Sequence, residues 1–170
     1  KDTHGIMALG VARRGYLVFN ISYRLAPEHP FPAAVEDAAD AYEWVVKNAA
    51  RYGGDPQQLI VAGESAGANL ATVLTMAACF ERPEPYAQKV FATGVVPRVV
   101  IPTCGIFQVT DPDRFHRRKP KLSQFLRDRI TEVHDSYLGH ARNWPADERA
   151  LADPLLLLES DVQPVRSLPP

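Results

Sequence analysis

Apolar residues along this chain fall into two alternating patterns, short strand-like runs and longer helix-like stripes. Runs rich in β-forming residues predict three strands, at 16–23, 59–62 and 99–107. Apolar residues at helical spacing predict helices at 6–14, 33–52, 66–80 and 122–138. Strands that alternate with helices are typical of a three-layer α/β fold, in which helices cover both faces of a central parallel sheet.

The helix expected at 33–52 has the clearest buried stripe. Its apolar positions follow one another at steps of four and three, and they are Val35, Ala39, Tyr42, Val46 and Ala49. Gly53 is expected to end this helix. Before it, residues 24–32 contain three prolines and predict an ordered extended loop. In this loop we expect an ion pair between Arg24 and Glu28, and a packing or hydrogen-bonding role for His29 rather than that of a catalytic base.

The second half of the chain is less regular. Residues 111–121 are rich in charge and predict a solvated segment. Residues 151–170 read as a loop that carries a run of four leucines at 155–158.

Composition narrows the function classes. The 170 residues are enough for one domain, and 46% of them are hydrophobic, as expected of a protein with a core. A net charge of −1 gives no reason to propose nucleic acid or an anionic membrane as a partner. No apolar run is long enough to span a bilayer, and the first residues do not resemble a signal peptide, so a cytoplasmic location is expected. Cys79 and Cys104 show no metal-binding spacing and are expected to be buried reduced thiols.

The most informative stretch is Gly63-Glu64-Ser65-Ala66-Gly67, which lies between a predicted strand and a predicted helix. A serine on a sharp strand-to-helix turn is the nucleophile elbow of hydrolases. The two glycines allow the strand and helix to approach closely, and the first amides of the helix point toward a developing oxyanion. The five-residue pattern is weakly specific alone, because a turn of small residues between strand and helix also satisfies it.

Two longer motifs, at 23–34 and 59–71, resemble the hormone-sensitive-lipase-like esterases of the α/β-hydrolase superfamily. The resemblance implies that Ser65 is the nucleophile of a serine carboxylesterase and that the amide of Ala66 belongs to the oxyanion hole. Gly63, Glu64 and Gly67 then complete the elbow, with glutamate at a position where the family commonly has aspartate. A small-molecule ester is the implied substrate, attacked to give an acyl-enzyme. No cofactor or metal is implied, and the oligomeric state stays open.

The rest of the family's catalytic machinery has no clear match in this chain. The resemblance places the glycine-rich oxyanion loop before Lys1 and the catalytic aspartate and histidine beyond Pro170. The sequence around Asp153 is similar to the motif that contains the family's catalytic aspartate, but we interpret Asp153 as a residue other than the catalytic one. Residues 1–170 are therefore expected to be the central part of an incomplete hydrolase domain, with a lid-like helical segment near 111–145. Alone, they are expected to be inactive and marginally stable.

Three alternatives stay open at this point. The chain order Ser, Asp, His is also satisfied internally by Ser65 with Asp113 or Asp135 and with His116 or His140. A base must lie within hydrogen-bond reach of the serine, and the sequence spacing between Ser65 and these histidines does not predict such a contact. The protein is otherwise a hydrolase-fold small-molecule-binding protein without the catalytic base, or an inactive truncated product.

Overall fold

The computed structural model describes residues 4–170. Its helices are α1 (Gly5–Ala12), α2 (Ala33–Asn48), α3 (Ala66–Cys79), α4 (Pro85–Ala92), α5 (Asp113–Arg118), α6 (Gln124–Leu138) and α7 (Pro154–Leu158). Two strands, β1 (Ile60–Glu64) and β2 (Val99–Thr103), lie between them in the chain. Single 3₁₀ turns occupy Ala49–Tyr52, Pro56–Gln58, Gly139–Asn143 and Ala150–Ala152. All four helices expected from the sequence are therefore present, with ends that differ by a few residues.

The two strands form a parallel pair. Ile60 lies opposite Val99, and the register continues to Glu64 opposite Thr103. The predicted strand 99–107 is shorter than expected, because the backbone bends after Thr103, where Cys104 has a φ of 54°. A parallel pair joined through helices is the arrangement that the alternating pattern predicted, and an α/β fold is confirmed.

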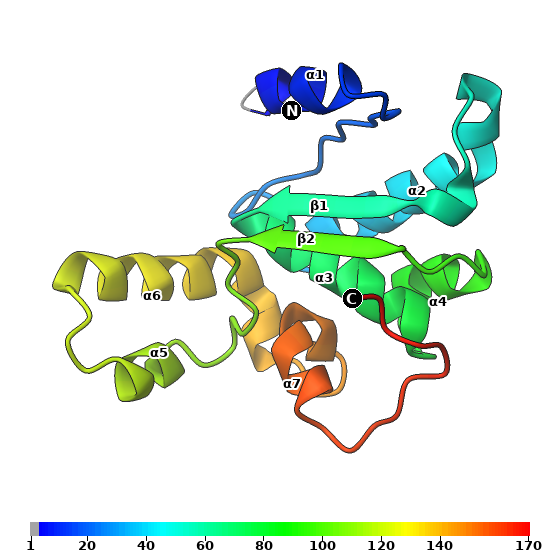
Figure 1. Ribbon diagram of the computed structural model, residues 1–170. Helices are drawn as coiled ribbons and strands as arrows, with labels where there is room; N and C mark the ends of the chain where they lie inside the picture. The colour runs from blue at the N-terminus through cyan, green and yellow to red at the C-terminus, as the bar shows by residue number, and fades with distance from the viewer. Residues whose placement is uncertain (1–3) are drawn as a thin grey trace.

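The strand expected at 16–23 is not a strand in the structure. Residues 16–25 have an extended course without any strand pairing among the described residues. Figure 1 shows this segment descending from α1 toward the loop before α2, on the side of β1 away from β2. A strand needs a neighbour to bond its backbone, so β-forming composition alone did not suffice here.

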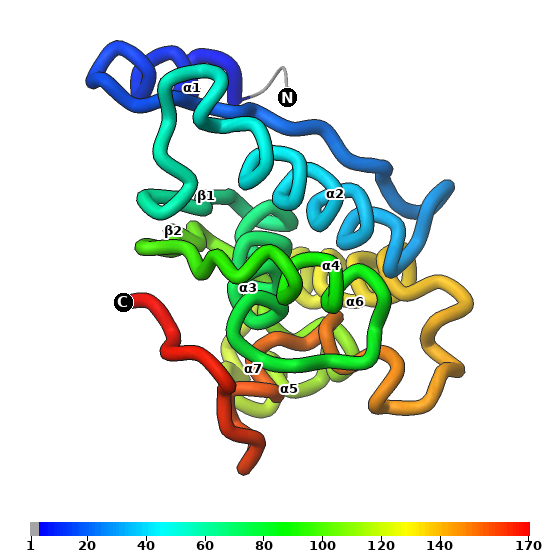
Figure 2. Tube along the Cα trace, turned by 90° about the vertical axis from the view of Figure 1, so that its right-hand side faces the viewer, coloured from blue at the N-terminus to red at the C-terminus, as the bar shows by residue number. Residues whose placement is uncertain are grey.

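Helix α3 is the centre of the core. It packs against both strands, while α2 and α4 pack against α3 and against each other (Figures 1 and 2). Its buried residues are Ala68, Asn69, Leu70, Ala71, Val73, Leu74, Thr75, Met76, Ala77, Ala78 and Cys79. Because α3 is apolar on nearly every side, it is a core helix rather than an amphipathic surface helix.

The stripe predicted on α2 faces this core. Val35, Ala39, Tyr42 and Ala49 are buried, and Val46 is partly buried against the same cluster. The buried Tyr42 hydroxyl donates a hydrogen bond to the Val95 carbonyl at 2.9 Å, so its polar end is satisfied.

The end of α2 also follows expectation. The helix passes into a 3₁₀ turn at Ala49–Tyr52, and Gly53 ends that turn with a left-handed φ of 82°. A left-handed residue at this place favours glycine.

The ion pair expected between Arg24 and Glu28 is wrong. Arg24 instead pairs with Asp37 at 2.8 Å and with Glu36 at 3.0 Å, both in the first turns of α2. Its backbone amide also donates to Asp37 at 2.7 Å. The carboxylates raise the pKa of the Arg24 guanidinium, and Arg24 lowers the pKa of Asp37. The proline-rich loop is thus fixed to the start of α2 rather than to itself.

Phe31 joins this loop to the second half of the chain. Its ring is buried and makes edge-to-face contacts with Tyr86, Tyr137 and Trp144. Its amide donates to the Tyr137 carbonyl at 2.6 Å. The last turn of α6 and the turn after it are therefore anchored on the loop that precedes α2.

The remaining segments depart in part from the sequence expectations. The charged residues 111–121 include the short helix α5, and the stretch expected to be a loop includes α7. Within residues 155–158, Leu157 is buried, whereas Leu156 and Leu158 are exposed. The lid-like role of residues 111–145 stays a prediction.

The two cysteines differ from one another. Cys79 is buried as expected, but the expectation of a buried Cys104 is wrong, because that residue is exposed after the end of β2. Among the helices of residues 4–170, none combines the length and the apolar character needed to cross a membrane.

Candidate active site

Ser65 is the single residue between the end of β1 at Glu64 and the start of α3 at Ala66. Its backbone has φ 54° and ψ −115°, a conformation that costs energy for a residue other than glycine. Its amide donates to the Thr103 carbonyl at 2.9 Å, and its carbonyl accepts from the amide of Ala68 at 3.1 Å. The strand pair and the first turn of α3 thus hold the strained residue from both sides.

The glycines around Ser65 have different roles. A methyl group added at Gly63 would overlap the carbonyl group of Gly67 and lie 2.9 Å from the amide nitrogen of Ala68. Strand and helix therefore come together closely at Gly63, as the motif predicted. The same expectation fails for Gly67, where an added methyl group would meet no atom of the described residues within 4 Å.

The surroundings of Ser65 suit an attacking hydroxyl. Ser65 and Ala66 are both exposed, whereas the helix that follows is buried from Ala68 onward except at Thr72. Ala66 is the first residue of the 14-residue helix α3, and the amides at a helix start carry partial positive charge. Negative charge that develops beside Ser65 would be stabilised at this helix end.

Asn69 is a site residue that sequence reasoning missed. Its buried side-chain amide donates to the carbonyl of Ile106 at 2.8 Å and to that of Ala152 at 3.3 Å. It joins the first turn of α3 to two loops that lie far away in the sequence. The available signal was an amide side chain on a helix whose other residues are apolar or threonine.

Glu64, the last residue of β1, has a partner that was also missed. The Nε2 atom of His4 lies 2.9 Å from its carboxylate oxygen Oε2, and both side chains are partly exposed. No spacing rule connects residues that are sixty positions apart, so only the fold reveals this contact.

The acid and base candidates of an internal triad are occupied elsewhere. Asp113 lies 3.3 Å from His116 within α5, and Asp135 pairs with Arg142 at 2.8 Å. His140 packs its ring against Trp144. Within residues 4–170, no hydrogen bond joins any of these groups to the Ser65 hydroxyl, and Figures 1 and 2 place α5 well apart from β1.

Asp153 has a structural position. It is 2% exposed and accepts hydrogen bonds from the amides of Val109 and Thr110 and from the Thr110 hydroxyl. These contacts fix the chain after β2 to the start of α7, and they account for a buried carboxylate without assigning it a catalytic role.

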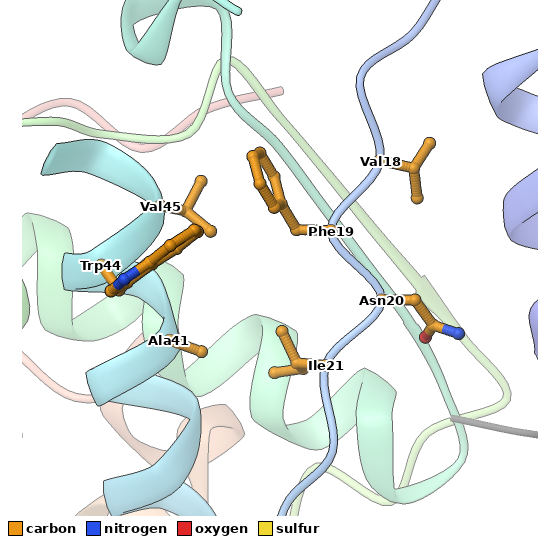
Figure 3. A pocket seen from close by; sticks show the side chains of 7 residues that line it. All are labelled: Val18, Phe19, Asn20, Ile21, Ala41, Trp44 and Val45. Atoms are coloured by element: carbon orange, nitrogen blue, oxygen red, sulfur yellow. The ribbon is translucent and has the colours of Figure 1, made fainter. Parts of the chain in front are cut away.

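A shallow groove between α2 and the extended segment contains no charged side chain among its lining residues (Figure 3). It is lined by Val18, Phe19, Asn20, Ile21, Ala41, Trp44 and Val45. The ring of Phe19 makes edge-to-face contacts with Trp44 and Tyr52. Without a nucleophile, acid or base in its lining, this groove offers no reacting group.

This chain is similar in sequence to known hydrolases. A family model described as the alpha/beta hydrolase fold matches residues 1–170. Carboxylesterase NlhH of Mycobacterium tuberculosis is 46% identical over 78 residues, which are 45% of this chain and 24% of that protein.

Two solved structures resemble most or nearly all of the chain. An esterase from the hyperthermophilic archaeon Pyrobaculum calidifontis gives a TM-score of 0.68 at 27% identity, over 99% of this chain and 49% of that one. An esterase from the bacterial hormone-sensitive lipase family gives a TM-score of 0.51 at 26% identity, over 79% of this chain and 39% of that one. The chain thus spans about half of the first structure's length, and its match covers about a quarter of the curated relative.

Proposed function

This chain belongs to the α/β-hydrolase fold family, and from that premise we propose that the protein carrying it is a serine ester hydrolase with Ser65 as nucleophile. The observation that carries the proposal is the backbone at Ser65, an exposed serine held at a φ of 54° between a parallel strand and the start of a helix. Relatives named carboxylesterase and esterase support a small-molecule ester as the substrate.

In the proposed reaction the Ser65 oxygen bonds to the ester carbonyl carbon while its proton passes to a general base. The negative charge then moves to the carbonyl oxygen, where the Ala66 amide and the start of α3 stabilise it. When the tetrahedral adduct collapses, the carbon–oxygen bond to the alcohol breaks and the alcohol leaves with a proton. Water releases the acid from the acyl-enzyme by the same steps. We propose that the base, which must come within hydrogen-bond reach of the Ser65 hydroxyl, belongs to the whole protein outside residues 4–170.

The Ser65→Ala variant of the whole protein tests the proposal. With p-nitrophenyl butyrate as substrate we expect kcat to fall by at least about 10³-fold, because the acyl-enzyme cannot form. Ser167→Ala is a matched control, since Ser167 is also an exposed serine but lies in the C-terminal loop. It should retain wild-type turnover, and circular dichroism should show the same melting temperature for both variants.

Labelling with a fluorophosphonate separates an enzyme from a binding protein. An activated Ser65 reacts covalently with this probe, whereas a serine without a base does not. Labelling that disappears in the Ser65→Ala variant supports the hydrolase. Turnover that survives in a pure Ser65→Ala preparation would overturn the assignment.

A further inference from the structure

The contact between His4 and Glu64 lies directly beside the proposed nucleophile. Glu64 is the last residue of β1 and immediately precedes Ser65, while His4 immediately precedes α1. The two side chains meet at 2.9 Å across sixty residues of sequence. Nothing in the proposed reaction uses either group, so the contact needs its own explanation.

The chemistry of the pair fixes the direction of the hydrogen bond. An ionised carboxylate only accepts hydrogen bonds, so the Nε2 atom of His4 carries the proton that it shares with Glu64. The side chains are 42% and 54% exposed, and water therefore weakens the attraction without removing it.

The contact is not explained by packing of the helix that His4 precedes. None of the eight residues of α1 is buried, and Ile6 is 87% exposed. Among the described residues, the hydrogen bond to Glu64 therefore connects the start of α1 to the elbow.

A free carboxylate at residue 64 would be harmful to the proposed reaction. Glu64 immediately precedes Ser65, and its side chain leaves β1 on the face opposite to that of Gly63, which faces α3. An unpaired Glu64 carboxylate, on the residue next to Ser65, would repel the developing oxyanion.

We propose that His4 is a positioning residue, which binds the Glu64 carboxylate and keeps its charge away from the oxyanion site beside Ser65. This inference rests on the proposed function. His4 acts through Glu64 and contacts no reacting atom.

A double-mutant cycle on the whole protein tests the proposal. With p-nitrophenyl butyrate, His4→Ala should lower kcat about threefold at unchanged KM, a size set by a partly exposed pair. Glu64→Gln removes the charge, so the effect of His4→Ala should disappear in that background, and the double variant should match Glu64→Gln alone. His4→Gln, which keeps an N–H donor, should recover most of the loss. If His4→Ala does not fold, His4→Leu, which also lacks a hydrogen-bond donor, takes its place in the cycle with the same non-additive loss expected.

The results separate this inference from a failure of the proposed function. If Ser65→Ala abolishes turnover but His4→Ala leaves kcat unchanged, only the positioning role is wrong. A loss in the double variant equal to the product of the two single losses would also overturn it, because a purely structural role does not depend on the charge of Glu64. If Ser65→Ala remains active, the proposed function itself fails.

Discussion

Replacing Gly63 with alanine tests whether close contact between β1 and α3 maintains the elbow. The added methyl group would overlap the Gly67 carbonyl group, which is backbone and cannot rotate away. To restore ordinary contact, strand and helix must separate by roughly 1 Å. Overpacking of this kind costs about 1–3 kcal/mol, and we expect the upper end because no flexible side chain can absorb it.

A cost of about 3 kcal/mol corresponds to a fall in melting temperature of roughly 6–12 °C for a domain of about 150–250 residues, and to a smaller fall in a longer domain. The assay is thermal unfolding of the whole protein, followed by circular dichroism at 222 nm, together with ester turnover at 25 °C. We expect turnover to fall as well, because the displaced helix moves the Ala66 amide relative to Ser65.

Gly67→Ala is the matched control four residues later. A methyl group there meets no described atom within 4 Å, and alanine favours a helix more than glycine does. Its melting temperature should therefore equal or exceed that of the wild type. The reasoning would be refuted if the two variants melted at the same temperature.

Three further predictions concern the body of the fold. Arg24 lowers the pKa of Asp37, so the stability from this contact is present above the ordinary pKa of 3.8 and is lost as the pH falls through the lowered value. Asp37→Asn should therefore weaken the dependence of the unfolding free energy on pH in the acid range, as measured by urea titration at a series of pH values. In the native protein Cys104 should react quickly with a thiol reagent and Cys79 slowly, because Cys79 is buried and its pKa is raised by burial; equal labelling rates, resolved by peptide mass spectrometry, would contradict this. Leu151→Ala should cost about 2–5 kcal/mol in urea unfolding because Leu151 is fully buried, whereas Leu156→Ala, at a 40% exposed site, should cost less than about 1 kcal/mol; similar losses would be evidence against the burial assigned here.

Local patterns predicted most of the elements. The helical stripe from Val35 to Ala49 and the apolar helix after Ser65 are each determined by residues a few positions apart, and both lie where expected. The elbow was also readable, because its geometry depends on five consecutive residues.

Contacts between distant residues were not predictable in the same way. The partners of Arg24 depended on how the proline-rich loop meets α2, and the partner of Glu64 depended on where residue 4 lies. The extended segment 16–25 shows the same limit, because strand formation requires a neighbour as well as suitable composition. The sequence therefore indicated the turn that carries Ser65, but not the residues that surround it.

The aromatic cluster around Phe31 anchors only the carboxyl end of α6. Leu138, at the carboxyl end of α6, is fully buried, whereas Phe125, near its start, is 69% exposed. Bending of this helix therefore disturbs few contacts at its outer end and many at its inner end. A displacement of α6 therefore costs least free energy at its start, near Phe125, far from the aromatic cluster that holds its other end.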